Sequence, residues 1–163
     1  RNLCFQPEKR FHHAELGFNF RLTNLQAAVG LAQVERLDEF IKIKVKLAAC
    51  YRRLIEAIPG IRFMPVKPWA KSVHWMYAVE LDPRAGLDAV TVMERMRARG
   101  VGTRPFFMGL HRQPALLELG LFCDESYPNT DRAHRFGFYL PSGLTLTEAM
   151  VDKVVAALRD SLK

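Results

Sequence analysis

The sequence predicts an α/β chain of the α+β type, in which a long N-terminal helix leads into a small, mostly antiparallel sheet with helices packed on one face. Two observations predict this fold. Apolar residues recur at helical period from Leu25 to Ile58, and short β-branched and aromatic runs alternate with amphipathic helical patterns after Pro59. This order of elements is typical of a small sheet domain attached to a connecting helix.

The long helix has clear start and stop signals. Thr23 and Gln26 fit a capping box, in which each side chain bonds to the backbone amide of the other residue. Pro59-Gly60 ends the helical pattern. Because the pattern is longer than a usual globular helix, we expect a bend or a break near Lys42 to Lys46.

Shorter elements follow Pro59. Strands are predicted at 61–64, 73–81, 101–107 and 138–140, and helices at 87–99, 114–119, 129–136 and 145–162. Pro105 confines its strand to an edge or ends it, because proline lacks the amide that a central strand needs. Thr145 to Glu148 fit a second capping box, and the helix that follows carries one apolar face: Met150, Val151, Val154, Val155 and Leu158.

Composition excludes several classes. The formal charge of +7 is dispersed over solvated helix faces, which argues against a nucleic-acid-binding protein. No apolar run is long enough to span a membrane, and no secretory signal opens the chain. The three cysteines stand far apart without zinc spacing, so we interpret them as reduced thiols of a cytoplasmic protein. Arg1 is not an initiator methionine, and we expect a piece of a longer polypeptide.

Two loops could carry chemistry, although no phosphate loop, metal motif or nucleophile motif is present. In the first, "GFNFRLTN", Asn19 and Arg21 stand two residues apart and share a face in an extended segment. An amide donor beside a guanidinium suits a phosphate or carboxylate oxygen. The sequence alone favours the alternative, a loop anchor, with Asn19 bonded to backbone and Arg21 paired with an acid such as Glu15.

The second loop is "GTRPFFMGLHRQP", where Arg104 and His111 flank an aromatic turn stiffened by prolines. A cation, an imidazole and aromatic faces suit an anionic, partly planar ligand. The alternative is a core edge, with Phe106 packed and His111 a capped surface residue.

The two loops carry a family resemblance. The runs "HAELGFNFRLTNLQAAVGLAQVERLDEF", "GTRPFFMGLHRQP" and "YLPSGLTLTEAMVDKVVAAL" resemble the C-terminal part of the sugar-nucleotide aminotransferases of the DegT/DnrJ/EryC1/StrS family. The forms "TRPFF" and "RNLCFQPEKR" are similar to its GDP-perosamine synthase branch. The resemblance covers nearly the whole chain and implies the C-terminal domain of a fold-type I transferase.

The resemblance implies pyridoxal 5'-phosphate as cofactor, glutamate as amino donor and a homodimer whose active site is shared between subunits. It implies that Asn19 contacts the cofactor phosphate of the partner protomer, with Arg21 beside it. Arg104, Phe106 and His111 would lie near the sugar nucleotide. The role implied for His13, also near the substrate, is less defined.

Two departures from the family matter. Phe18 and Phe20 stand where many members have tyrosines, which removes two hydroxyl groups. The Schiff-base lysine has no match in this chain, and neither Lys9 nor Lys71 stands in its context, so we expect it upstream of Arg1. Residues 1–58 would then complete the large cofactor domain and the dimer interface, and residues 59–163 would form the small domain.

The sequence therefore predicts part of an aminotransferase that aminates a nucleotide-linked 4-keto-6-deoxy sugar of the perosamine type, inactive as this piece alone. It predicts no metal site, no nucleic-acid partner and no membrane contact. Two alternatives remain open at this point. One is a basic binding module for nucleic acid or an acidic partner, which would bind oligonucleotides with steep salt dependence. The other is a structural or regulatory domain without catalysis.

Overall fold

The computed structural model describes residues 5–6, 8–13 and 15–163. The chain divides into two compact units, Arg1–Asp38 and Glu39–Lys163, called here the N-terminal and the C-terminal unit. Each unit is described by itself.

The N-terminal unit contains a hairpin, an extended loop and a helix. Strands β1 (Phe5–Gln6) and β2 (Lys9–His13) pair antiparallel, and α1 spans Asn24–Val34. The capping box is confirmed, because the Gln26 amide donates to Thr23 Oγ1 at 3.2 Å and the Thr23 amide donates to Gln26 Oε1 at 2.9 Å. The cap fixes where the preceding loop ends.

The predicted helix is interrupted, but not where we expected. It breaks at Glu35 and Arg36, between α1 and α2 (Leu37–Ile55), whereas Lys42 to Lys46 lie inside α2. Lysine is unbranched and a good helix former, so alternate lysines do not weaken the helix. At the true break the Arg36 amide donates to the Gln33 carbonyl, a tighter turn that no proline or glycine marks in the sequence.

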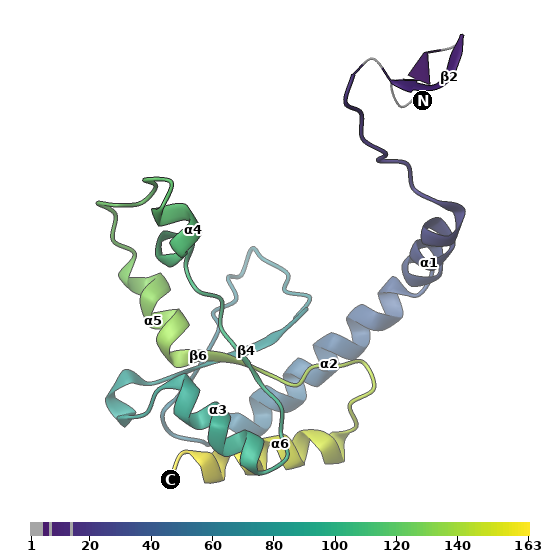
Figure 1. The fold of residues 1–163 in the computed structure, drawn as a ribbon. Coiled ribbons are helices and arrows are strands. Elements are labelled where there is room, and N and C mark those ends of the chain that lie inside the picture. The colour runs from purple at the N-terminus through teal and green to yellow at the C-terminus, as the bar shows by residue number, and fades with distance from the viewer. Residues whose placement is uncertain (1–4, 7, 14) are drawn as a thin grey trace. The chain divides into compact units, whose positions relative to one another are not determined.

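The C-terminal unit contains a four-stranded antiparallel sheet in the order β3-β4-β6-β5 (Figure 1). Its strands are β3 (Ile61–Phe63), β4 (Tyr77–Leu81), β5 (Arg104–Pro105) and β6 (Gly137–Leu140). Among the strands of the described residues, β5 pairs only with β6, which confirms the edge position that Pro105 predicts. Strand β4 starts at Tyr77 and not at Val73, because His74 has a φ of 47°, which an extended strand does not accommodate.

One face of the sheet carries the core. Tyr77 lies opposite Leu140 and Val79 opposite Phe138, so these side chains point to the same side. They pack against α2, α3 (Ala89–Ala98) and α6 (Glu148–Ser161), whose buried residues include Ile55, Val92, Met96, Val151 and Leu158. Figure 1 shows these three helices on one side of the sheet.

The start of α6 corrects a detail of the prediction. The cap is Thr147, whose Oγ1 accepts from the Met150 amide at 3.3 Å, and not Thr145. This two-residue shift moves Met150 into the first turn, where its side chain is 51 % exposed and not in the core. Val151, Val154, Val155 and Leu158 are buried as predicted.

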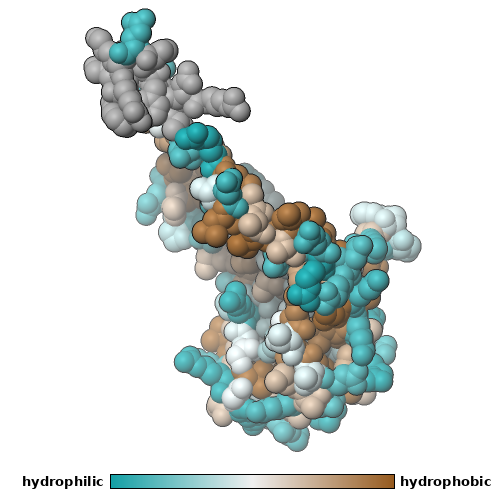
Figure 2. Space-filling model, turned by 90° about the vertical axis from the view of Figure 1, so that its right-hand side faces the viewer, coloured by the Kyte–Doolittle hydropathy of each residue, from teal (hydrophilic) through white to brown (hydrophobic). Residues whose placement is uncertain are grey.

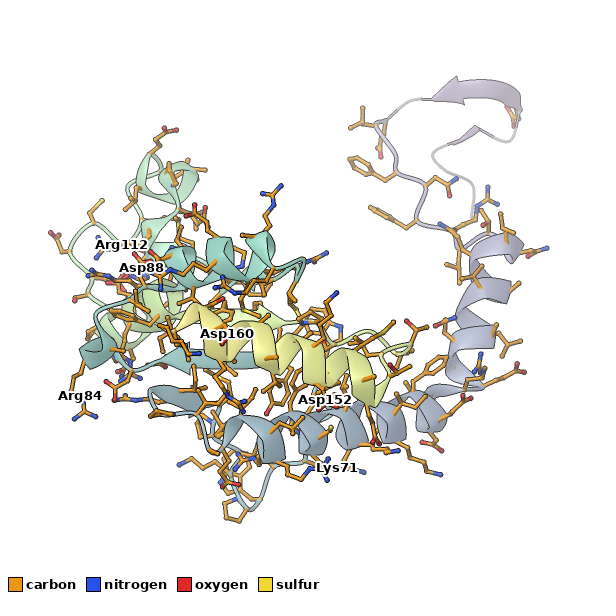
Figure 3. The ribbon with its side chains drawn as sticks, turned by 90° about the horizontal axis from the view of Figure 1, so that it is seen from below. Lys71, Arg84, Asp88, Arg112, Asp152 and Asp160 are labelled. Atoms are coloured by element: carbon orange, nitrogen blue, oxygen red, sulfur yellow. The ribbon has the colours of Figure 1, made fainter. Side chains whose placement is uncertain are left out.

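The other face of the sheet, called here the second face, carries the loops and α5 (Pro128–Phe136). Glu80, between the core residues Val79 and Leu81, points to this face and pairs with Arg132 of α5 at 3.1 Å. Two 3-10 turns, η1 (Pro83–Ala85) and η2 (Leu110–Arg112), and the short α4 (Pro114–Leu117) complete the unit. Figure 3 shows Asp88, the cap of α3, and Asp160 near the end of the neighbouring α6.

Helix α1 exposes its apolar side chains. Leu25, Val29, Leu31 and Val34 are each more than half exposed, and Figure 2 shows apolar surface over this segment. The apolar face of a helix is normally buried by packing against another element, and this burial provides most of the stability of the helix. Among the helices in the described part of the chain, none is long and apolar enough to span a membrane.

Candidate functional site

The loop before α1 presents Asn19 as a hydrogen-bond donor. The side-chain oxygen of Asn19 accepts from the backbone amide of Arg21 at 3.1 Å. This bond uses the amide oxygen, so the two N–H donors of the Asn19 side chain are left for other partners. Asn19 is exposed, and its local bond to backbone is also what the loop-anchor alternative predicts.

Arg21 and the two aromatic rings complete this loop. Arg21 is exposed and, within residues 15–163, makes no ion pair, so this part of the chain shows no pair with an acid such as Glu15. Phe18 and Phe20 stack with ring centroids 5.7 Å apart, as residues two apart in an extended segment can do. The loop therefore offers an amide and a guanidinium to an anion.

Arg104 lies on the second face of the sheet, away from the core. It stands opposite Tyr139 in the β5–β6 register, so the two side chains share a face. Both line a cleft of about 580 Å³, called here the Arg104 cleft, together with Trp75, Thr103 and Ser142. None of the residues that line it is Asp or Glu. An exposed guanidinium without a neighbouring carboxylate suits an anionic ligand.

Phe106 lies next to this cleft and is held at three points. Its ring stacks on Tyr139 at 5.1 Å between centroids, its amide donates to the Gly137 carbonyl at 3.2 Å, and its carbonyl oxygen lies 3.1 Å from His134 Nδ1. A ring nitrogen facing a carbonyl oxygen must carry a proton, so Nδ1 of His134 is the donor. The segment that carries Arg104 and Phe106 is therefore fixed to the α5–β6 junction.

The structure places His111 away from the Arg104 cleft. His111 is buried in η2, and its Nε2 lies 2.9 Å from Asp131 Oδ1. Asp131 also accepts two bonds from Arg112, and these bonds, followed by the one from His111, lower the pKa of Asp131 to about 2. A Cβ at Gly109 would lie 2.5 Å from the His111 ring, so a larger residue there would displace the ring from its position.

Two residues that the sequence did not single out hold one wall of the Arg104 cleft. Lys44 of α2 donates to the carbonyl oxygens of Trp75, at 3.1 Å, and Ser142. Tyr51, also of α2, donates to the carbonyl oxygen of Pro141 at 2.8 Å. Burial lowers the pKa of Lys44 from its ordinary value. Neither residue carries a sequence signal for these contacts, since partners lie 31 to 98 positions away.

The remaining sequence predictions concern His13, the cysteines and metal binding. His13 ends β2, but its side chain lies outside the part that the structure describes. Cys4 lies outside the described residues as well. Within the described residues, no group of three or more His, Cys, Asp or Glu side chains could hold a metal ion.

Comparisons with known proteins agree with the resemblance. The DegT/DnrJ/EryC1/StrS aminotransferase family matches residues 1–159. The chain is 32 % identical over 153 residues to a GDP-perosamine synthase of Caulobacter vibrioides, covering 93 % of this chain and 40 % of that protein. It is 28 % identical over 155 residues to a GDP-perosamine synthase of Vibrio cholerae, covering 93 % and 41 %. The chain thus spans about two fifths of the length of these curated relatives.

Solved structures show the same fold. The aminotransferase TlmJ of Streptoalloteichus hindustanus matches 99 % of this chain and 42 % of its own with a TM-score of 0.81 at 25 % identity. DesV of S. venezuelae matches 95 % and 40 % with a TM-score of 0.77, also at 25 % identity. The predicted fold class is confirmed. The chain belongs to the DegT/DnrJ/EryC1/StrS aminotransferase family.

Proposed function

We propose that this chain is the C-terminal part of an aminotransferase that moves an amino group from glutamate to the 4-keto carbon of a nucleotide-linked 4-keto-6-deoxy sugar. Within this class of sugars, we propose GDP-4-keto-6-deoxymannose, the perosamine-type substrate. The observation that carries the proposal is the carboxylate-free cleft beside Arg104, in a chain 32 % identical to a GDP-perosamine synthase. We place the enzyme in the cytoplasm, where nucleotide sugars and glutamate are available.

The loop before α1 fits the phosphate of pyridoxal 5'-phosphate by its donor set. The hydrogen bond from the Arg21 amide occupies the side-chain oxygen of Asn19 and leaves its N–H donors. Phosphate oxygens accept hydrogen bonds, so donors are what a phosphate requires. Arg21 adds a permanent positive charge two residues on. The cofactor, when bound, supplies the electron sink for amino transfer. The exposure of the loop and of the α1 side chains supports a role at the site of a partner protomer in a homodimer.

Arg104 would bind the diphosphate of the sugar nucleotide as a forked donor, and Phe106 would pack beside the sugar. For His111 we propose an indirect role. Its ring is buried against Asp131 and Tyr127, so it orders the 106–112 segment and does not itself extend into the Arg104 cleft. His13 keeps its predicted place near the substrate.

The lysine that forms the Schiff base with the cofactor would lie upstream of this chain. The share of the relatives that the chain covers, about two fifths, supports this proposal. The chain by itself would then orient cofactor and substrate but would not carry out amino transfer. Glutamate would leave as 2-oxoglutarate and the keto sugar as the amino sugar.

The whole enzyme tests this proposal. With pyridoxal phosphate, glutamate and GDP-4-keto-6-deoxymannose, it should form a GDP-linked 4-amino sugar, detected by mass spectrometry, in amounts equal to 2-oxoglutarate. Omission of glutamate is the control. Absence of amino sugar with this and with other nucleotide-linked 4-keto sugars would contradict the proposal. The 163-residue chain alone should show no borohydride-trapped lysine adduct at a single defined position.

A further inference from the structure

An exposed tryptophan borders the Arg104 cleft and has no role so far. Trp75 precedes β4, and its side chain is 70 % exposed although an indole is a large and mostly apolar ring. Its backbone is fixed, because the carbonyl oxygen of Trp75 accepts from Lys44 at 3.1 Å. Because the backbone is already fixed, the exposed ring loses little conformational entropy when it binds a ligand.

The chemistry of the cleft restricts its ligand. Trp75, Arg104 and Tyr139 line it from three segments of the chain, β5, β6 and the turn before β4. Its volume of about 580 Å³ lies in the range of small-molecule sites. A flat aromatic face and a guanidinium in one carboxylate-free cleft favour a ligand that joins an aromatic ring to an anion.

We propose that Trp75 stacks against the base of a nucleoside diphosphate whose phosphates Arg104 binds. This inference rests on the proposed function and adds the residue that holds the base. Stacking of a base on an aromatic side chain accepts every base, because each has a π face, so Trp75 would supply affinity for the nucleotide part and not choice among bases.

The other tryptophan is a matched control. Trp69 is 85 % exposed but borders a different hollow, between α2 and the loop after β3, and does not line the Arg104 cleft. The chain has only these two tryptophans. Each single replacement, Trp69→Phe or Trp75→Phe, therefore leaves one reporter of fluorescence at a known place.

The experiment is a titration of the 163-residue chain with GDP, with intrinsic fluorescence as readout and circular dichroism as the check of folding. In W69F, GDP should quench the emission of Trp75 to saturation. Pyrophosphate has no base, so by itself it should leave the emission of Trp75 unchanged. Added after GDP, it should displace the nucleotide and restore the emission. In W75F, GDP should leave the emission of Trp69 unchanged. Trp75→Ala should weaken GDP binding, measured by calorimetry, by about tenfold.

Two results would overturn the inference: no saturable quenching of Trp75 in a folded W69F chain, or GDP affinity equal in W75A and wild type. Arg104→Gln should weaken the binding of both GDP and pyrophosphate, and an unchanged affinity for both would remove the phosphate half of the inference. Failure here is distinguishable from failure of the proposed function. Amino sugar formed by the whole enzyme without quenching of Trp75 contradicts only the stacking role, and quenching without amino sugar contradicts only the reaction.

Discussion

The hydroxyl of Tyr51 should stabilise the C-terminal unit by one hydrogen bond. Tyr51 is fully buried, stacks on Tyr77 with centroids 4.8 Å apart, and donates to the carbonyl oxygen of Pro141 at 2.8 Å. Tyr51→Phe keeps the ring and removes only this bond. A typical hydrogen bond contributes about 1 kcal/mol, which lowers the melting temperature of a chain of this size by roughly 2–4 °C.

Tyr77→Phe is the matched control. Tyr77 has the same ring in the same stack, but in the part of the chain that the structure describes its hydroxyl makes no hydrogen bond. We expect its free energy of unfolding to change by less than about 0.5 kcal/mol. Thermal and urea unfolding followed by circular dichroism would measure both variants. Equal losses in the two variants would refute the claim that the Tyr51–Pro141 bond holds the wall of the Arg104 cleft.

Three further predictions concern charge and caps. Burial raises the pKa of Tyr77 to about 12, so stability should be intact below pH 10 and fall as the pH rises toward 12, and Tyr77→Phe should flatten this fall in urea unfolding. Hydrogen bonds from Arg112 lower the pKa of Asp131 to about 2, so its stabilisation should be present above pH 4 and be lost as the pH falls through 2; a carboxyl that titrates near 4 by NMR would contradict this. Thr147→Ala should cost about 1 kcal/mol in chemical unfolding, and Thr145→Ala only a few tenths, since Thr147 is the cap; the reverse order would show that our assignment is wrong.

The sequence predicted those parts of the fold that depend on local physics. The capping box of α1 and the edge position of Pro105 follow from hydrogen-bonding rules that act within a few residues. The break between α1 and α2 did not follow, because neither Glu35 nor Arg36 is a helix breaker. The cap of α6 was misplaced because Thr145 and Thr147 both fit the start of the pattern, and only packing of the apolar face selects one.

The sequence predicted part of the candidate site, again the part that local patterns determine. Arg104 and Phe106 stand two residues apart in one motif; Arg104 lies opposite Tyr139, and the ring of Phe106, just after β5, stacks on the same Tyr139. His111 belongs to the same motif, but η2 turns it into the interior, where Asp131 pairs with it across twenty residues. The supports from Lys44 reach even farther along the chain, to Ser142, and no local pattern encodes them.

The proposed function depends most on the donor role of Asn19 at a partner's cofactor phosphate. The direct measurement is the dissociation constant of pyridoxal phosphate for the whole dimeric enzyme, wild type against Asn19→Ala, with the melting temperature of the cofactor-free protein recorded alongside. Loss of a hydrogen bond to a charged phosphate, about 1.5–3 kcal/mol, predicts cofactor binding weaker by about tenfold or more and an unchanged melting temperature. Unchanged cofactor affinity with a lowered melting temperature would contradict the account and identify Asn19 as a structural loop anchor.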